Sequence, residues 1–342
     1  MTTTIFDAPY GNDSEIPGWL SEDGHGHMRG NDYLFTLERN ADWLIVNDTP
    51  YSCFWTDIPR ERRILFIGEP KEIHDCSKIR YYIEQFGTVV THYELPGYSG
   101  RVITSNPNLG WTAGIRGELS TLPRALNFQP PQKTRGLSII TSLKHKTPYH
   151  RKRLAFLREL QREFAGEIEC FGREFNPVDD KLDAVEPYKY HVVIENSRHS
   201  YYWTEKLCDA WAGWALPIYC GDPAILQQIP DKNGIVIIDV DDIEGSLRKI
   251  HEVINSDVYL SRLEAIGRCR EWALKASDRY ETTCRIIEEF NDTTPKLARP
   301  ELFRRLISRS KNALYELMKG VSPRFADKVF ESYHRMKGRV WE

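Results

Sequence analysis

Five polar residues follow an apolar run, YHVVI, that is typical of a buried strand: Glu195, Asn196, Thr204, Glu205 and Lys206. A helix beginning near Thr204 would offer free backbone N–H groups and a partial positive charge, which favour anions. The Lys206 ammonium adds a point charge suited to phosphate. Alone, TEK is more typical of a simple helix cap with a solvated lysine. With IEN before it and LPIYCGDP after it, an anion site becomes the better interpretation.

Three other apolar runs also end in polar residues: RILFIGE at Glu69, GLSIITS at Ser142 and EIECFGR at Arg173. Ligands of open α/β sheets bind outside the carboxyl ends of the strands, where these residues would lie. A guanidinium can bind a diphosphate through two parallel hydrogen bonds. A partly desolvated carboxylate can act as a base. As isolated residues, Glu69 would more often be a cap or salt bridge and Arg173 a surface arginine.

The elements that would position these residues alternate along the chain. Strands are predicted at 42–47, 63–69, 87–93, 100–106, 136–142, 167–172, 190–195, 216–221 and 234–240. Helices are predicted at 77–86, 149–164, 204–214, 243–255 and 258–290. Val- and Ile-rich runs separated by helix-length segments indicate parallel sheets in an α/β protein. LNFQPPQKTRG (126–136) is interpreted as a linker between two doubly wound domains, so the expected active site is the cleft between them.

Composition narrows the class of protein. The 342 residues carry a net charge of −3, which gives the whole molecule no strong attraction to nucleic acid. Seven cysteines without a CxxC pair favour a reducing compartment over disulfides or a zinc site. The chain has no GxGxxG or GxxxxGK[ST] phosphate loop, no signal-peptide pattern and no apolar run long enough to span a membrane. These features predict a cytoplasmic protein that is neither a dehydrogenase nor a P-loop NTPase.

The stretch YKYHVVIENSRHSYYWTEKLCDAWAGWALPIYCGDP (188–223) resembles the signature of the α-1,3/1,4-fucosyltransferases, glycosyltransferase family 10, of bacterial type. The shared features are EN, TEK, the tyrosine two residues before the threonine, and PIYxGxP. Upstream, SIITS and Arg153, Phe156 and Leu160 are similar to the family pattern, as is EIECFGR. RILFIGEP resembles the family element that bears its proposed base.

The resemblance implies a GT-B architecture, in which two Rossmann-like domains face a central cleft. It also implies transfer of L-fucose from GDP-fucose to a glycan hydroxyl, with inversion and without a catalytic metal or other cofactor. Glu69 would be the general base, while Arg173 and Lys206 would stabilise charge on the departing GDP. The other expected donor-binding residues are Ser142, Glu195, Asn196, Tyr202, Thr204 and Glu205. Asp239, Asp241 and Asp242 are expected to close a strand and begin a helix.

Departures from the family pattern keep alternatives open. Ile194 and Trp203 replace the usual Phe and Val, and Pro70 replaces an asparagine after Glu69. The alternatives are the same fold acting on another nucleotide sugar, and a nucleotide-sugar-binding protein without activity. The acceptor is expected to be a bacterial surface saccharide or another glycoconjugate. Its identity, the linkage and the oligomeric state do not follow from the sequence.

The expected domains are an acceptor-binding domain (1–128), a donor-binding domain (129–290) and a basic helical tail (291–342). Residues 296–342 hold 12 Lys or Arg against 5 Asp or Glu. Segment 301–320 is predicted to be an amphipathic helix, with Leu302, Phe303, Leu306, Ile307, Leu314, Leu317 and Met318 on one face. Such a helix would either make a peripheral contact with the inner face of the membrane or pack on the N-terminal domain.

Overall fold

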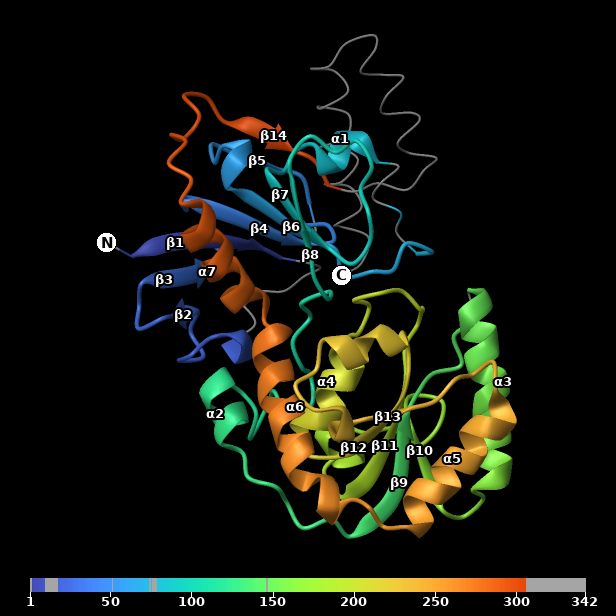
Figure 1. The fold of residues 1–342 in the computed structure, drawn as a ribbon. Helices are drawn as coiled ribbons and strands as arrows, with labels where there is room; N and C mark the ends of the chain where they lie inside the picture. The colour runs from blue at the N-terminus through green and yellow to red at the C-terminus, as the bar shows by residue number, and fades with distance from the viewer. Residues whose placement is uncertain are drawn as a thin grey trace.

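The structure is a computed structural model that describes residues 2–9, 18–50, 52–73, 75, 79–145 and 147–305. Two large β-sheets lie one above the other (Figure 1), and each has its own hydrophobic core. Parallel strands dominate both sheets, so the predicted α/β architecture with two Rossmann-like sheets is confirmed.

The first sheet has the strand order β2-β3-β1-β4-β6-β7-β8. Its strands are β1 (Thr3–Ala8), β2 (His27–Met28), β3 (Tyr33–Thr36), β4 (Trp43–Asn47), β6 (Arg63–Phe66), β7 (Thr88–Thr91) and β8 (Arg101–Thr104). All neighbours are parallel except β2 and β3, which form an antiparallel pair. β1 lies between β3 and β4 and was not predicted from the sequence.

Side chains of the first sheet alternate between two apolar layers, as the pleat of a strand requires. Leu44 of β4 packs in one layer with helix α1 (Arg80–Ile83), and Ile45 packs in the other with helix α7 (Arg279–Phe290). In this second layer the Tyr280 ring of α7 stacks on Phe35, with ring centroids 3.7 Å apart. The first sheet is therefore completed by a helix that follows the whole second sheet in the chain.

The second sheet has the strand order β10-β9-β11-β12-β13. Its parallel strands are β9 (Arg135–Ile140), β10 (Ile168–Phe171), β11 (Tyr188–Ile194), β12 (Leu216–Cys220) and β13 (Val236–Ile237). Its helices are α3 (Pro148–Glu163), α4 (Glu205–Ala212), α5 (Ile243–Asn255) and α6 (Leu263–Ala276). Figure 1 shows α3 and α5 together on one side of this sheet and α4 and α6 on the other. Helix α2 (Leu122–Asn127) precedes β9, and 128–134 is neither helix nor strand.

The prediction of one helix over 258–290 was wrong. The chain instead forms a short 3₁₀ turn, then α6, a break at Ser277 and Asp278, and α7. Asp278 caps α7, because its Oδ1 accepts the backbone N–H groups of Tyr280 (2.7 Å) and Glu281 (3.3 Å). The break lets α6 pack on the second sheet while α7 packs on the first.

The predicted helix over 301–320 was wrong at its first residues. Residues Glu301–Phe303 form β14, which pairs antiparallel with β5 (Phe54–Thr56) beside the first sheet. The buried Phe303 ring stacks on Phe54 at 4.9 Å, so this segment packs on the N-terminal sheet. Residues 306–342 lie outside the described part, and the amphipathic helix and its membrane contact stay predictions there.

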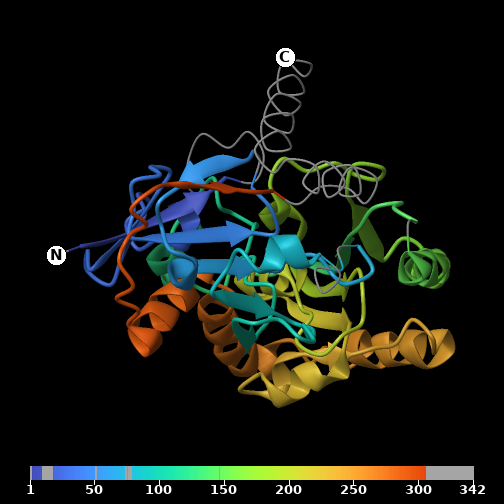
Figure 2. The same ribbon diagram turned by 90° about the horizontal axis from the view of Figure 1, so that it is seen from above.

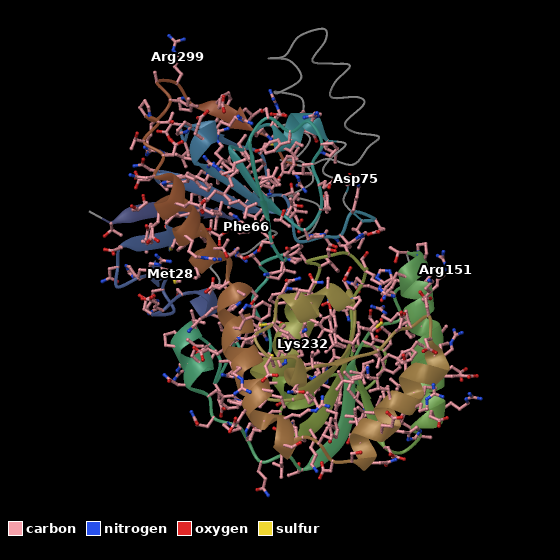
Figure 3. The ribbon with its side chains drawn as sticks, viewed as in Figure 1. Met28, Phe66, Asp75, Arg151, Lys232 and Arg299 are labelled. Atoms are coloured by element: carbon pink, nitrogen blue, oxygen red, sulfur yellow. The ribbon has the colours of Figure 1, made fainter. Side chains whose placement is uncertain are left out.

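The two sheets and the helices packed on them form two lobes, and each lobe contains residues that are far apart in the sequence. Figure 3 shows Met28, Phe66 and Arg299 in the lobe of the first sheet, and Arg151 and Lys232 in the other lobe. The view from above in Figure 2 shows the segment after α7 running back across the first sheet. In the described ranges, no helix has both the length and the apolar character needed to cross a membrane.

Candidate active site

A cavity of about 250 Å³ opens at the carboxyl ends of β9 and β11. The strand order reverses here, because β10 lies on one side of β9 and β11 on the other. Ligands of doubly wound sheets bind at such a switch point. Four of the predicted donor-binding residues line the cavity: Ser142, Asn196, Glu205 and Lys206.

Helix α4 begins at this cavity, and a buried carboxylate fixes its first residues. Thr204 is the N-cap, and its Oγ1 accepts the backbone N–H of Lys206 at 3.4 Å. The fully buried Glu195 accepts both the N–H and the hydroxyl of Thr204, each at 2.8 Å. Burial raises the pKa of Glu195, against the opposing effect of Lys206. Glu195 therefore orients the start of the helix from within the core.

Charges of both signs surround the first turn of α4. The Lys206 ammonium lies 3.1 Å from Glu205 Oε1 and 3.9 Å from Glu195 Oε2. Lys181 lies 3.8 Å from Glu205 and 3.0 Å from Asp209. Burial alone would raise the pKa of Glu205, but Lys206 and Lys181 outweigh it and lower that pKa to about 2. Burial works against the charge of Lys206, yet Glu205 and Glu195 raise its pKa. Both side chains are therefore charged at neutral pH.

Arg153 of α3 also lines the cavity and is almost fully buried. Its Nη1 donates to Asn196 Oδ1 and its Nη2 to the carbonyl of Ser142, both at 2.9 Å. It thus joins the ends of β9 and β11. Burial lowers the pKa of Arg153, and its buried Nε has no hydrogen-bond partner among the described residues.

The cationic residues of the cavity that were missed as site residues include Arg153 and Lys181. Arg153 belongs to the matched family pattern, but its spacing did not reveal that it would bridge two strand ends. Lys181 has no local signal, because it reaches the cavity from a short 3₁₀ turn after β10. Together with Lys144 and Lys206, they give the cavity four cationic side chains.

Asp209 of α4 ties the cavity to the segment between the two sheets. This buried carboxylate accepts from Lys181 at 3.0 Å, from the Thr112 hydroxyl at 2.9 Å and from the Ala113 N–H at 2.9 Å. Because these partners satisfy both its oxygens, Asp209 acts as a support for Lys181.

Glu69 follows β6 of the first sheet and is half-buried. The backbone N–H groups of Gly68 and Glu69 donate to Asp48 Oδ1 at 2.8 and 3.1 Å, which fixes the turn that carries Glu69. Burial raises the pKa of the Tyr202 phenol, and the carboxylates of Glu195, Glu205 and Glu69 raise it further. The Glu69 carboxylate is therefore within electrostatic range of the Tyr202 phenol.

The loop after β11 also contacts the first sheet directly. Glu72 accepts from Ser197 Oγ at 2.9 Å and bonds with His199 Nε2 at 2.7 Å. The ring of His92, which follows β7, lies 4.8 Å from the ring of Tyr202. The site is thus built from the facing carboxyl ends of both sheets.

Arg173 is exposed and does not line the cavity. It follows β10 after Gly172, which has φ +132° and whose backbone approaches Thr141 so closely that a Cβ would lie 2.0 Å from the Thr141 oxygen. Its predicted role in charge stabilisation stays a prediction.

Each acidic residue around Asp239 has a protein partner. Asp239 pairs with Arg198 at 2.9 Å, Asp241 with Lys152 at 2.7 Å, and Asp242 caps α5 as predicted. Within the described ranges, no group of three or more His, Cys, Asp or Glu could hold a metal ion. The thiols of Cys170, Cys208, Cys220, Cys269 and Cys284 form no disulfide among the described residues.

Several solved structures that are similar to this chain are α1,3-fucosyltransferases. The chain is 16% identical to one such crystal structure, with a TM-score of 0.50, 86% of this chain covered and 91% of that chain. It is 17% identical to an α1,3-fucosyltransferase with GDP, again with a TM-score of 0.50 and coverages of 86% and 91%. A structure of an α1,3-fucosyltransferase with GDP-fucose is 15% identical, with a TM-score of 0.49 and coverages of 87% and 93%. The likeness shows the GT-B fold.

Residues 130–297 match the profile of the glycosyltransferase family 10 (fucosyltransferase) C-terminal region. This range contains the second sheet, the cationic cavity and helices α3 to α7. Over this range the chain is similar to glycosyltransferase family 10.

Proposed function

We propose that the protein transfers L-fucose from GDP-fucose to a hydroxyl of a glycan acceptor. The observation that carries this proposal is the group of cations in the cavity at the switch point, which includes Arg153, Lys181 and Lys206 beside the start of α4. Such a site suits a nucleoside diphosphate. The match of residues 130–297 to the fucosyltransferase family and the GDP complex of a structural relative favour GDP-fucose over other donors.

The proposed reaction is a single displacement with inversion at the anomeric carbon. Glu69, on the first sheet, takes the proton from the acceptor hydroxyl as that oxygen attacks. The bond from the sugar to the GDP oxygen breaks, and negative charge grows on the diphosphate. Lys206 and Arg153 stabilise that charge where it develops, which lowers the barrier to transfer. Arg173 would contribute to this stabilisation only if its side chain moved from its exposed position into the cavity.

The remaining predicted residues have supporting roles in this proposal. Glu205, ionised at neutral pH, accepts hydrogen bonds from sugar hydroxyls. Asn196 and Ser142, both held by Arg153, orient the nucleotide. Glu195 and Thr204 preserve the geometry of the helix start. The linkage is proposed to be of the α1,3 type.

The test uses GDP-fucose labelled in its sugar and an array of immobilised glycans. Transfer of label to at least one glycan, with the opposite anomeric configuration in the product, is the expected result. Transfer with retained configuration would refute the single displacement. Binding of GDP-fucose without transfer to any glycan would favour a nucleotide-sugar-binding protein, and transfer only from another donor would favour the second alternative.

A further inference from the structure

A second cavity, of about 510 Å³, lies between the two lobes beside the candidate active site. One wall is the carboxyl end of β8, with Thr104 and Ser105. The opposite wall contains Tyr201, Gln228 and Trp272. Its volume falls in the range of ligand sites, about 300–1,000 Å³.

We infer that this groove between β8, Tyr201 and Trp272 binds a saccharide unit of the acceptor, next to the unit that receives the sugar. The inference rests on the proposed function and extends it to an acceptor subsite. Three observations support it: the types of side chain in the groove, their charge, and their position relative to Glu69.

The side chains suit a pyranose ring. Tyr201 is 41% exposed, and Trp272 is half-buried against Trp203, with ring centroids 5.1 Å apart. Aromatic faces pack against the C–H face of a sugar, while its hydroxyls need polar partners. Gln228 Oε1 accepts from Trp203 Nε1 at 3.1 Å, so the Gln228 amide nitrogen is available as a donor. Thr104 is exposed and adds a hydroxyl.

Two of the three charged side chains that line the groove are paired with side chains of opposite charge. Lys275 pairs with Glu271 at 2.8 Å, and Glu281 pairs with Arg29 at 2.7 Å. This leaves Arg285, which donates to Thr282 at 3.0 Å, as the remaining charged group of the lining. The donor cavity is lined by four cations, which suit a nucleotide, whereas this groove suits a saccharide better.

The groove lies on the same edge of the first sheet as the proposed base. Glu69 follows β6, and β8 lies two strands away in the order β6-β7-β8. Two strand spacings amount to about 10 Å. Tyr201 also follows the loop residues Ser197 and His199, which bond to Glu72 of the first lobe, three residues after Glu69. A glycan whose reacting unit lies at Glu69 would therefore place a neighbouring unit in the groove.

The backbone supports a functional role for Tyr201. Its φ is +63°, a conformation that is uncommon for non-glycine residues and that concentrates at functional sites. This geometry holds the tyrosine ring at the rim of the groove. It also provides a suitable variant, because asparagine tolerates positive φ and Tyr201→Asn removes the ring without straining the turn.

The test measures indole N–H resonances of ¹⁵N-labelled protein during titration with lactose, N-acetyllactosamine, chitotriose and maltotriose. Trp272→Phe assigns the Trp272 resonance. At least one saccharide is expected to shift it, with affinity reduced about 3- to 10-fold in Tyr201→Asn and retained in Tyr201→Phe. The inference is overturned if none of the four saccharides shifts this resonance, or if Tyr201→Asn binds as tightly as the parent protein.

A parallel titration with GDP-fucose separates this inference from the proposed function. Donor affinity is expected to be the same in Tyr201→Asn as in the parent protein, because the ring lies outside the donor cavity. If GDP-fucose binds and no saccharide reaches Trp272, only the groove assignment fails. If GDP-fucose does not bind, the proposed function fails.

Discussion

Replacing Lys206 with methionine should lower both the stability of the protein and its affinity for GDP. The Lys206 ammonium lies 3.1 Å from Glu205, whose side chain is only 21% exposed. The pKa of Glu205 falls from 4.5 to about 2 in the folded protein. A depression of this size corresponds to about 3 kcal/mol of stabilisation at pH 7. Because Lys206 and Lys181 share this effect, the free energy of unfolding of Lys206→Met is expected to be about 2 kcal/mol lower than that of the parent protein at pH 7.

The effect has a defined dependence on pH. A carboxyl group with a depressed pKa stabilises the folded state above its unfolded pKa, and this stabilisation is lost as the pH falls through the folded value. The difference in unfolding free energy between the parent protein and Lys206→Met should therefore be largest near pH 7. It should shrink between about pH 4.5 and pH 2 as Glu205 becomes protonated.

Urea unfolding at several pH values measures this difference, and GDP titration measures the affinity. Loss of a charge-assisted contact of about 1.5–3 kcal/mol predicts GDP binding weaker by about 10- to 100-fold. Lys189→Met is the matched control, because Lys189 pairs with Asp257 near the surface at 2.8 Å and does not line the cavity. Lys189→Met should lower the free energy of unfolding by less than about 1 kcal/mol and leave GDP affinity unchanged. A pH-independent loss in Lys206→Met, or unchanged GDP affinity, would refute the reasoning.

Three further predictions concern the base, the backbone and metals. Glu69→Gln should leave GDP binding intact while transfer falls about 10²- to 10⁴-fold in a labelled-fucose assay; an unchanged rate would place the base elsewhere. Gly172→Ala should lower the urea midpoint strongly, because its Cβ would lie 2.0 Å from the Thr141 oxygen. Gly166 also has positive φ but open space around it, so Gly166→Ala should lower the urea midpoint less. Transfer should persist in EDTA, and its abolition would bring Asp239 and Asp241 back as metal ligands.

The second sheet was predicted well because its signals are local. Each of its strands is an apolar run followed by a helix-length segment, and the parallel pairing follows from that alternation. The polar residues at the ends of β9 and β11 could be identified before the strand order was known. Ser142 and Asn196 then lie together because their strands are neighbours.

The first sheet shows where local reasoning fails. Strand β1 carries Thr3 and Thr4 before a short apolar run, and it lies between strands that follow it in the chain. Nothing near the N-terminus in the sequence shows that pairing. The break between α6 and α7 did have a local signal, since Asp278 and Glu281 have the spacing of a capping box. The helical pattern continues on both sides of Asp278, so the sequence was interpreted as one helix.

The donor cavity shows the same limit. Lys206 was identified because it belongs to a compact motif. Lys181 acts on Glu205 across 24 positions of the chain, and Asp209 supports it through contacts with Thr112 and Ala113. Such a group is assembled by tertiary structure, so spacing along the chain does not reveal it.

Donor binding tests the central claim most directly. The melting temperature is measured with GDP-fucose, GDP-mannose, UDP-glucose and UDP-galactose, each at the same concentration. A ligand at 100 times its dissociation constant adds about 2.7 kcal/mol to the stability of the folded state. We predict that GDP-fucose gives the largest increase, and that this increase is reduced in Lys206→Met. No increase with GDP-fucose, or a larger one with a UDP-sugar, would contradict the account.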